Sequence, residues 1–256
     1  MVTYLLKKSY RRKDLNEIKF KDLWNEHGVF TTMWIYGLPP KILFFKEHIN
    51  NLIKSVKAYN ILKPLTKKNI LKLLKKNLNT KKNYNHLVRV ALNKDVISIS
   101  LRKRVQPKLN FNLKLVNLKR QKPEFKNLKY KDILKYLAKI DNTKEDIGLC
   151  FNNQIFETGT SNILFIKNNK VFSPINKFYK GITYNFFIKK IKKIINKNIL
   201  ISSLKEYDEI ILIGSGKGVV SIKTINEIKW KRKNLKFYKV LLKYYLSAIN
   251  SYPKYN

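Results

Sequence analysis

Residues 157–174 read ETGTSNILFIKNNKVFSP, and this stretch indicates how the second half of the chain folds. Residues 163–166 (ILFI) are apolar and partly β-branched or aromatic, which favours a strand. The KNNK segment at 167–170 is typical of a hairpin turn, and 171–174 returns as a second strand. Residues 148–157 are strand-like too, so the sequence predicts neighbouring strands joined by short turns.

Glu157 ends one of these predicted strands, in a segment of small and hydroxyl residues that runs from Thr158 to Asn162. A buried carboxylate needs a partner, and a protonated ring nitrogen would be one. A polar turn accounts for the same residues equally well. From the residues alone, both interpretations stay open.

Outside this stretch, strands and helices are mixed without a regular βαβ series, which predicts an α+β fold. Strands are predicted at 29–36, 42–45, 86–92, 96–102, 210–213 and 219–222. Helices are predicted at 47–62, 69–78, 130–138, 184–195 and 235–248. The polar KRQKPE segment at 119–124 contains a proline that favours extended backbone. We therefore expect a small N-terminal α+β domain over 1–118 and a larger C-terminal domain over 119–256.

The composition is strongly basic, with 55 Lys and Arg against 16 Asp and Glu and a net charge of +39. Such a charge is compatible with a nucleic-acid-binding protein. However, the lysines are spread along the whole chain, and Gly (8) and Pro (7) are scarce, as an AT-rich coding sequence would produce. We favour this second explanation and keep nucleic-acid binding as an alternative of another class.

Cys150 is the only cysteine, which excludes an internal disulfide and a multi-cysteine metal site. No segment approaches the ~20 apolar residues that span a bilayer. The first residues lack the apolar region of a secretory signal. We expect a cytoplasmic protein with no metal and no membrane partner.

Two glycine-containing segments could bind an anion. Gly181, Ile182 and Thr183 precede the predicted helix at 184–195, whose first N–H groups and dipole favour negative charge. The segment GSGKG at 214–218 follows a predicted buried strand and lacks the spacing of a P-loop. A helix cap and an ordinary turn explain these two segments as well.

Taken in order, these segments resemble the fold-type-IV enzymes that use pyridoxal 5'-phosphate (PLP): branched-chain aminotransferases, D-amino-acid aminotransferases and aminodeoxychorismate lyases. The resemblance runs from about residue 28 to 222. Its most specific parts are HGVFTT (27–32), KEHINNLIKSVKAY (46–59), KNLKY (126–130), ETGTSNILFI (157–166), GIT (181–183) and GSGKGVVSI (214–222). It implies a two-domain, D-amino-acid-aminotransferase-like fold with the cofactor between the domains, and a homodimer.

The resemblance also implies roles for single residues. Lys126 is similar to the lysine that forms a Schiff base with PLP, although composition alone selects no lysine. Glu157 resembles the acid that pairs with the pyridinium nitrogen. The groups implied at the cofactor phosphate are Ile182, Thr183, Ser215 and Gly216, and Tyr130 follows the lysine near the cofactor. Asn51 stands where the family usually has an arginine, and Lys54, one turn on, could substitute as a point charge.

Within the family, Val29-Phe30-Thr31-Thr32 is similar to the lyases, whereas branched-chain aminotransferases have V-F-E-G there. The implied reaction converts 4-amino-4-deoxychorismate into 4-aminobenzoate and pyruvate, for folate biosynthesis. Lys126 would remove the C4 proton, and Thr31 would help protonate the departing group or its water. The basic residues expected to pair with substrate carboxylates are Arg89, Lys94 and Lys217. A branched-chain or D-amino-acid aminotransferase of the same fold is the alternative.

Overall fold

The computed structural model describes residues 4–61 and 67–253, and these form two compact units. Unit 1 holds the described residues of Met1–Arg104, Phe125–Tyr130 and Tyr252–Asn256. Unit 2 holds Val105–Glu124 and Lys131–Ser251. The chain thus leaves unit 2 at Glu124, contributes a short segment to unit 1, and returns. The sequence predicted two domains that meet near residue 119. Whether each of these parts folds independently stays a prediction.

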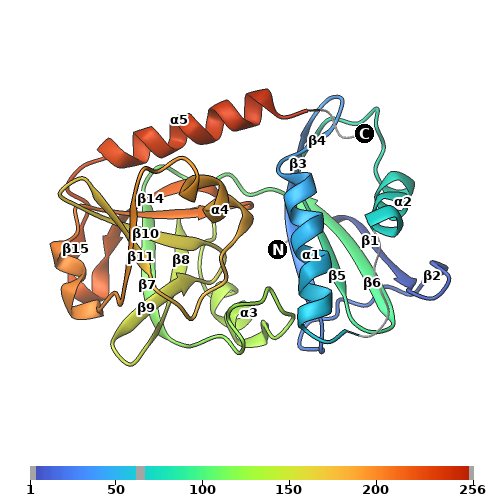
Figure 1. The fold of residues 1–256 in the computed structure, drawn as a ribbon, viewed down its shortest axis with the longest axis horizontal. Helices are drawn as coiled ribbons and strands as arrows, with labels where there is room; N and C mark the ends of the chain where they lie inside the picture. Colours follow the sequence, from blue (N-terminus) through green and yellow to red (C-terminus); the bar gives the residue numbers. More distant parts are fainter. Residues whose placement is uncertain (1–3, 62–66, 254–256) are drawn as a thin grey trace. The chain divides into compact units, whose positions relative to one another are not determined.

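Within the described residues, unit 1 contains a six-stranded sheet in which every pair of neighbours is antiparallel. The strand order is β2 (Glu17–Ile18), β1 (Tyr4–Arg11), β6 (Val96–Lys103), β5 (Tyr84–Leu92), β3 (Val29–Gly37) and β4 (Lys41–Ile42) (Figure 1). The predicted strands at 29–36, 86–92 and 96–102 are confirmed within a residue or two.

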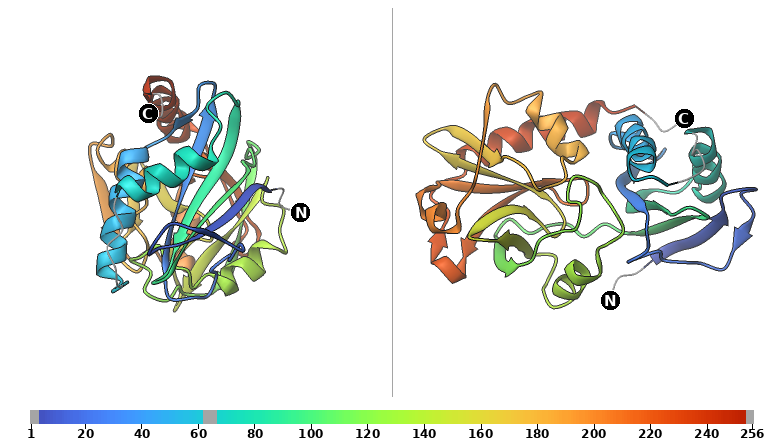
Figure 2. Two further views of the ribbon diagram at one scale, coloured as in Figure 1. Left: turned by 90° about the vertical axis from the view of Figure 1, so that its right-hand side faces the viewer. Right: turned by 60° about the horizontal axis from the view of Figure 1, so that its bottom comes forward.

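Helices α1 (Phe45–Ala58) and α2 (Lys67–Asn77) pack on this sheet and share one hydrophobic core with it (Figure 2). From α1, Ile49, Leu52 and Val56 enter the core at helical spacing, because the apolar stripe of the helix faces the sheet. Helix α2 matches its sequence prediction within two residues. Helix α1 ends at Ala58, earlier than the prediction of 47–62, because residues 59–61 leave the helix; Leu62 lies outside the described residues.

The described residues of unit 2 form a nine-stranded mixed sheet. Its order is β12 (Ile194–Lys197), β11 (Lys170–Pro174), β10 (Asn162–Lys167), β13 (Glu209–Gly214), β14 (Gly218–Ile225), β7 (Phe111–Asn117), β8 (Glu145–Phe151) and β9 (Gln154–Thr158), with β15 (Trp230–Lys231) paired to β14. The remaining elements are α3 (Lys131–Leu137), α4 (Ile182–Ile188), α5 (Lys236–Ser251) and the 3-10 helices η1 (Ile201–Glu206) and η2 (Asn226–Ile228). Helix α5 packs along β13 and β14 (Figure 1).

The hairpin predicted from the opening stretch is present. Strands β10 and β11 pair antiparallel, with Ile166 opposite Val171 and Lys167 opposite Lys170. Asn168 and Asn169 form the turn with φ values of 50° and 58°, a left-handed conformation that asparagine tolerates better than most residues.

Three further sequence predictions differ from the structure. The strand expected at 42–45 is only the two-residue β4, because helix α1 already begins at Phe45. The single strand expected at 148–157 is a hairpin of β8 and β9, with Asn152 and Asn153 at positive φ in the turn. The helix expected at 184–195 ends at Ile188, and β12 follows because its residues pair in parallel with β11. Strands β1 and β7 were not predicted. None of the described helices is both long and apolar enough to cross a membrane.

Candidate active site

The candidate site in unit 2 starts from Glu157, a buried residue near the end of β9. The Arg120 Nε atom donates a hydrogen bond of 2.7 Å to Glu157 Oε1, and only 1% of the Arg120 side chain is exposed. The Tyr179 amide lies 3.5 Å from the other carboxylate oxygen. A buried carboxylate is costly unless it is paired, so Arg120 supplies the charge that Glu157 requires. The sequence predicted Glu157 and missed Arg120, which was interpreted only as part of a linker.

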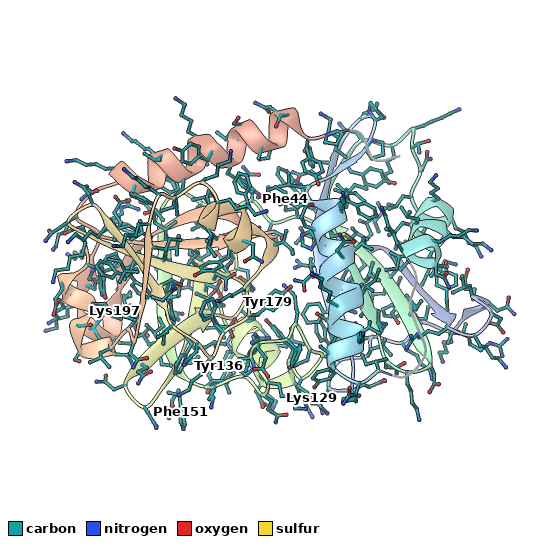
Figure 3. All side chains as sticks on the ribbon, viewed as in Figure 1. Phe44, Lys129, Tyr136, Phe151, Tyr179 and Lys197 are labelled. Carbon is teal, nitrogen blue, oxygen red and sulfur yellow. The ribbon has the colours of Figure 1, made fainter. Side chains whose placement is uncertain are left out.

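Asn162, at the start of β10, connects the Glu157 segment to the loop that precedes α4. Its Nδ2 atom donates to the Tyr179 carbonyl oxygen at 2.5 Å, and its Oδ1 atom accepts from the Gly181 amide at 3.0 Å. Figure 3 labels Tyr179 on this loop. A Cβ atom on Gly181 would lie 2.7 Å from Asn162 Oδ1. A larger residue at 181 would therefore have to displace the Asn162 amide from this contact.

Helix α4 brings the predicted phosphate groups together with the loop between β13 and β14. Gly181 is its N-cap, and Ile182 and Thr183 are buried in its first turn, where main-chain N–H groups have no partner within the helix. The Thr183 hydroxyl lies 3.4 Å from the hydroxyl of Ser215, the residue after β13. The two segments that the sequence assigned to one phosphate thus meet within unit 2.

Lys126 belongs to the segment Phe125–Tyr130, which pairs with the start of β3 in unit 1. The Phe30 amide donates to the Lys126 carbonyl oxygen at 2.9 Å, and the Leu128 amide donates to the Gly28 carbonyl oxygen at 2.9 Å. The Lys126 ammonium lies 5.3 Å from the centroid of the Phe30 ring. The backbone on both sides of Lys126 is therefore fixed, and its side chain is half-buried.

Thr31, also on β3, is buried and hydrogen-bonded to a histidine that the sequence analysis did not single out. Thr31 Oγ1 and His48 Nδ1 are 2.7 Å apart, and both side chains are buried. Burial, and then the positive charge of Lys126, lower the pKa of His48 to about 3. His48 is therefore neutral near pH 7. The charge effect also indicates that Lys126 lies in the electrostatic neighbourhood of this pair.

The other predicted residues have these surroundings. Tyr130 stacks on Trp24 and meets the Phe30 ring edge-on. Arg89 forms an ion pair with Asp22 and lies over the Trp24 ring. Lys54 on α1 and Lys94 in the β5–β6 turn are exposed, and Lys217 pairs with Asp146 at 2.8 Å. Their roles toward cofactor and substrate stay predictions.

These groups match the chemistry of PLP. Unit 2 offers a paired, buried acid for a ring nitrogen, together with hydroxyl and main-chain N–H groups for a phosphate. Unit 1 offers an amine for the aldehyde. Among residues 4–61 and 67–253, no cluster of three or more His, Cys, Asp or Glu side chains is placed to share a metal ion.

Solved structures with a similar fold include aminotransferases and a provisionally assigned lyase. A branched-chain aminotransferase of Thermoproteus uzoniensis has a TM-score of 0.78 at 14% identity, covering 97% of this chain and 96% of that chain. A provisionally assigned branched-chain aminotransferase of Thermotoga maritima has a TM-score of 0.76 at 21% identity, covering 96% of both chains. A provisionally assigned 4-amino-4-deoxychorismate lyase of Legionella pneumophila has a TM-score of 0.70 at 18% identity, covering 87% and 91%. The fold is that of the fold-type-IV PLP enzymes.

The sequence model of the family Amino-transferase class IV matches residues 28–225 of this chain. The chain belongs to the class IV aminotransferase family, whose members use PLP, and it is an enzyme of that family. A search of the curated proteins finds no match. The predicted fold class, family and cofactor are confirmed.

The Arg120 pair gives a first test. Arg120→Met leaves Glu157 buried without its cation, so we expect the unfolding free energy to fall by about 3–5 kcal/mol. The control is Arg120→Met combined with Glu157→Gln, which removes both charges and should recover most of the loss. Denaturant unfolding measures both variants. A loss under about 0.5 kcal/mol in the single variant would show that the pair is not needed.

His48 gives a test based on pH. Its pKa is about 3 in the folded chain and ~6.5 when unfolded, so the unfolded chain binds the proton first as the pH falls. Folded-state stability is therefore lost between those two values, by about 2 kcal/mol at about pH 5. Denaturant unfolding near pH 7.5 and pH 5 should show this extra loss in the wild type and not in His48→Asn, whose amide does not titrate. Equal losses would contradict the neutral state of His48.

Proposed function

We propose that this enzyme is a lyase that converts 4-amino-4-deoxychorismate into 4-aminobenzoate and pyruvate, a step of folate biosynthesis. The observation that carries the proposal is the buried Thr31 hydroxyl, whose oxygen lies 2.7 Å from His48 Nδ1. Burial and the charge of Lys126 lower the pKa of His48. A buried hydroxyl held in place by His48 suits a reaction that must protonate a departing enolpyruvyl group or its water. The similar fold of a provisionally assigned lyase from Legionella pneumophila adds support.

In this proposal, Lys126 would hold the cofactor covalently, and its amine would accept the C4 proton of the substrate. PLP supplies an electron sink for the charge left on the substrate. Glu157, paired with Arg120, accepts a hydrogen bond from the protonated ring nitrogen. The phosphate is held by the groups of Ile182, Thr183, Ser215 and Gly216.

Thr31 contributes mainly through position, because a hydroxyl is a weak acid at its ordinary pKa. Its hydrogen bond to His48 limits the directions in which the hydroxyl points. His48 is neutral near pH 7, so it adds no second positive charge near Lys126.

Further groups are proposed for the substrate and for the cofactor phosphate. Arg89, Lys94 and Lys217 remain the candidates for the substrate carboxylates. Arg89 and Lys217 are already bound to Asp22 and Asp146, whereas Lys94 is exposed. Lys54 is proposed to assist the phosphate in place of the usual arginine, with Tyr130 beside the cofactor. By family resemblance we also propose a cytoplasmic homodimer acting on a small molecule.

A branched-chain or D-amino-acid aminotransferase is the second candidate, because similar folds include branched-chain aminotransferases. This activity would transfer the amino group to a keto acid instead of releasing pyruvate. Nucleic-acid binding, the alternative suggested by the net charge of +39, would appear as strongly salt-dependent affinity for DNA or RNA.

The attachment of PLP to Lys126 predicts a visible absorption band in the purified holoenzyme. Lys126→Ala should abolish this band, because no other lysine is proposed to bond to the aldehyde. Lys129→Ala is the matched control, three residues away in the same segment, and should keep the band. A Lys126→Ala protein with the wild-type band would contradict the assignment.

The lyase proposal predicts equal amounts of pyruvate and 4-aminobenzoate from 4-amino-4-deoxychorismate. Thr31→Val, which keeps the shape and removes the hydroxyl, should lower kcat by about 10²-fold or more, whereas Thr31→Ser should retain most of it. Both products are measured by chromatography. Transfer of the amino group to 2-oxoglutarate, without release of pyruvate, would establish the aminotransferase instead.

A further inference from the structure

Asp146, at the start of β8, is a fully buried carboxylate that the proposed reaction does not use. Its Oδ1 atom accepts the Ile147 amide at 2.8 Å. Its Oδ2 atom accepts the Thr158 hydroxyl at 2.9 Å, the Thr160 hydroxyl at 2.7 Å and the Lys217 ammonium at 2.8 Å. Four donors on one buried acid make this a built network within unit 2.

The network joins the two loops that carry the proposed cofactor contacts. Thr158 and Thr160 follow Glu157 directly, and Lys217 follows Ser215 and Gly216. The loops also touch each other, because a Cβ atom on Gly214 would lie 3.0 Å from Ser161 Oγ and 3.4 Å from the Thr160 carbonyl oxygen. Asp146 thus connects both loops through its hydrogen bonds to Thr158, Thr160 and Lys217.

The charges of this network matter as much as its geometry. Without a cation beside it, the buried Asp146 carboxylate would repel a phosphate bound by the neighbouring loop. The repulsion would be strong because the effective dielectric constant is low inside the protein. Lys217 neutralises the carboxylate, and only 9% of the Lys217 side chain is exposed. The ammonium also lies 4.6 Å from the centroid of the Phe111 ring, which helps to hold it in place.

We propose that Asp146 and Lys217 are positioning residues that lock the 158–160 and 214–218 loops together and keep this region electrically neutral, so that the adjacent loop accepts a phosphate dianion. The inference rests on the proposed contacts of Ser215 and Gly216 with the cofactor phosphate. It gives Lys217 a role through Asp146, as an alternative to contact with a substrate carboxylate.

The test compares the affinity for PLP with that for pyridoxal, which lacks the phosphate. In Lys217→Met, the buried negative charge should weaken PLP binding by about tenfold or more and change pyridoxal binding much less, as expected for one unit charge within about 10 Å. In Asp146→Asn, the PLP to pyridoxal ratio should equal or exceed that of the wild type. The double variant should return the ratio to within about threefold of the wild type. Lys233→Met is the matched control, since Lys233 pairs with Asp208 on the surface of the same unit.

A purely structural role predicts a different result, because loosened loops would weaken PLP and pyridoxal alike. Equal losses for the two ligands, or no recovery in the double variant, would overturn the proposal. If Lys217→Met does not fold, Asp146→Asn should still show a higher ratio than the double variant, and the reverse order would overturn the proposal. A wild-type protein that binds PLP no better than pyridoxal would instead contradict the proposed phosphate site.

Discussion

The buried ion pair between Arg120 and Glu157 is the interaction on which the proposed cofactor site depends. Glu157 can present a negative charge to a ring nitrogen only if its burial is offset, and the 2.7 Å contact with Arg120 offers that compensation. Arg120 lies just before the point where the chain passes from unit 2 into the segment that carries Lys126. Arg120, which pairs with Glu157, therefore also lies close in sequence to Lys126, the proposed reactive amine.

Around this pair, short polar contacts hold three loops of unit 2 in fixed relation. Asn162 ties the start of β10 to the backbone before α4, and the hydroxyls of Thr183 and Ser215 approach each other. Asp146 connects the segment after Glu157 with the loop at 214–218, because it accepts hydrogen bonds from Thr158 and Lys217. Fixed donors of this kind lower the reorganisation needed when an anion binds, which supports the proposed phosphate site.

Much of the fold could be predicted from local pattern, and the parts that could not depend on tertiary partners. The β10–β11 hairpin and helix α1 follow from strand, turn and helix periodicity. The run at 184–195 has helical spacing, yet Ile194 lies in a strand because β11 offers it a partner. Arg120 and His48 gave no usable signal, since an arginine in a polar linker and a histidine on an amphipathic helix are common. Lys126 was found only through the resemblance to a family.

The central proposal is that Lys126 and Glu157 serve the same PLP. Its most direct test is to treat the PLP-loaded protein with borohydride, which makes a carbon–nitrogen double bond permanent, and then to map the labelled peptide by mass spectrometry. The account predicts a single pyridoxyl group on Lys126, with labelling much reduced in Glu157→Ala at limiting PLP. A label on another lysine, or labelling that does not depend on Glu157, would contradict it.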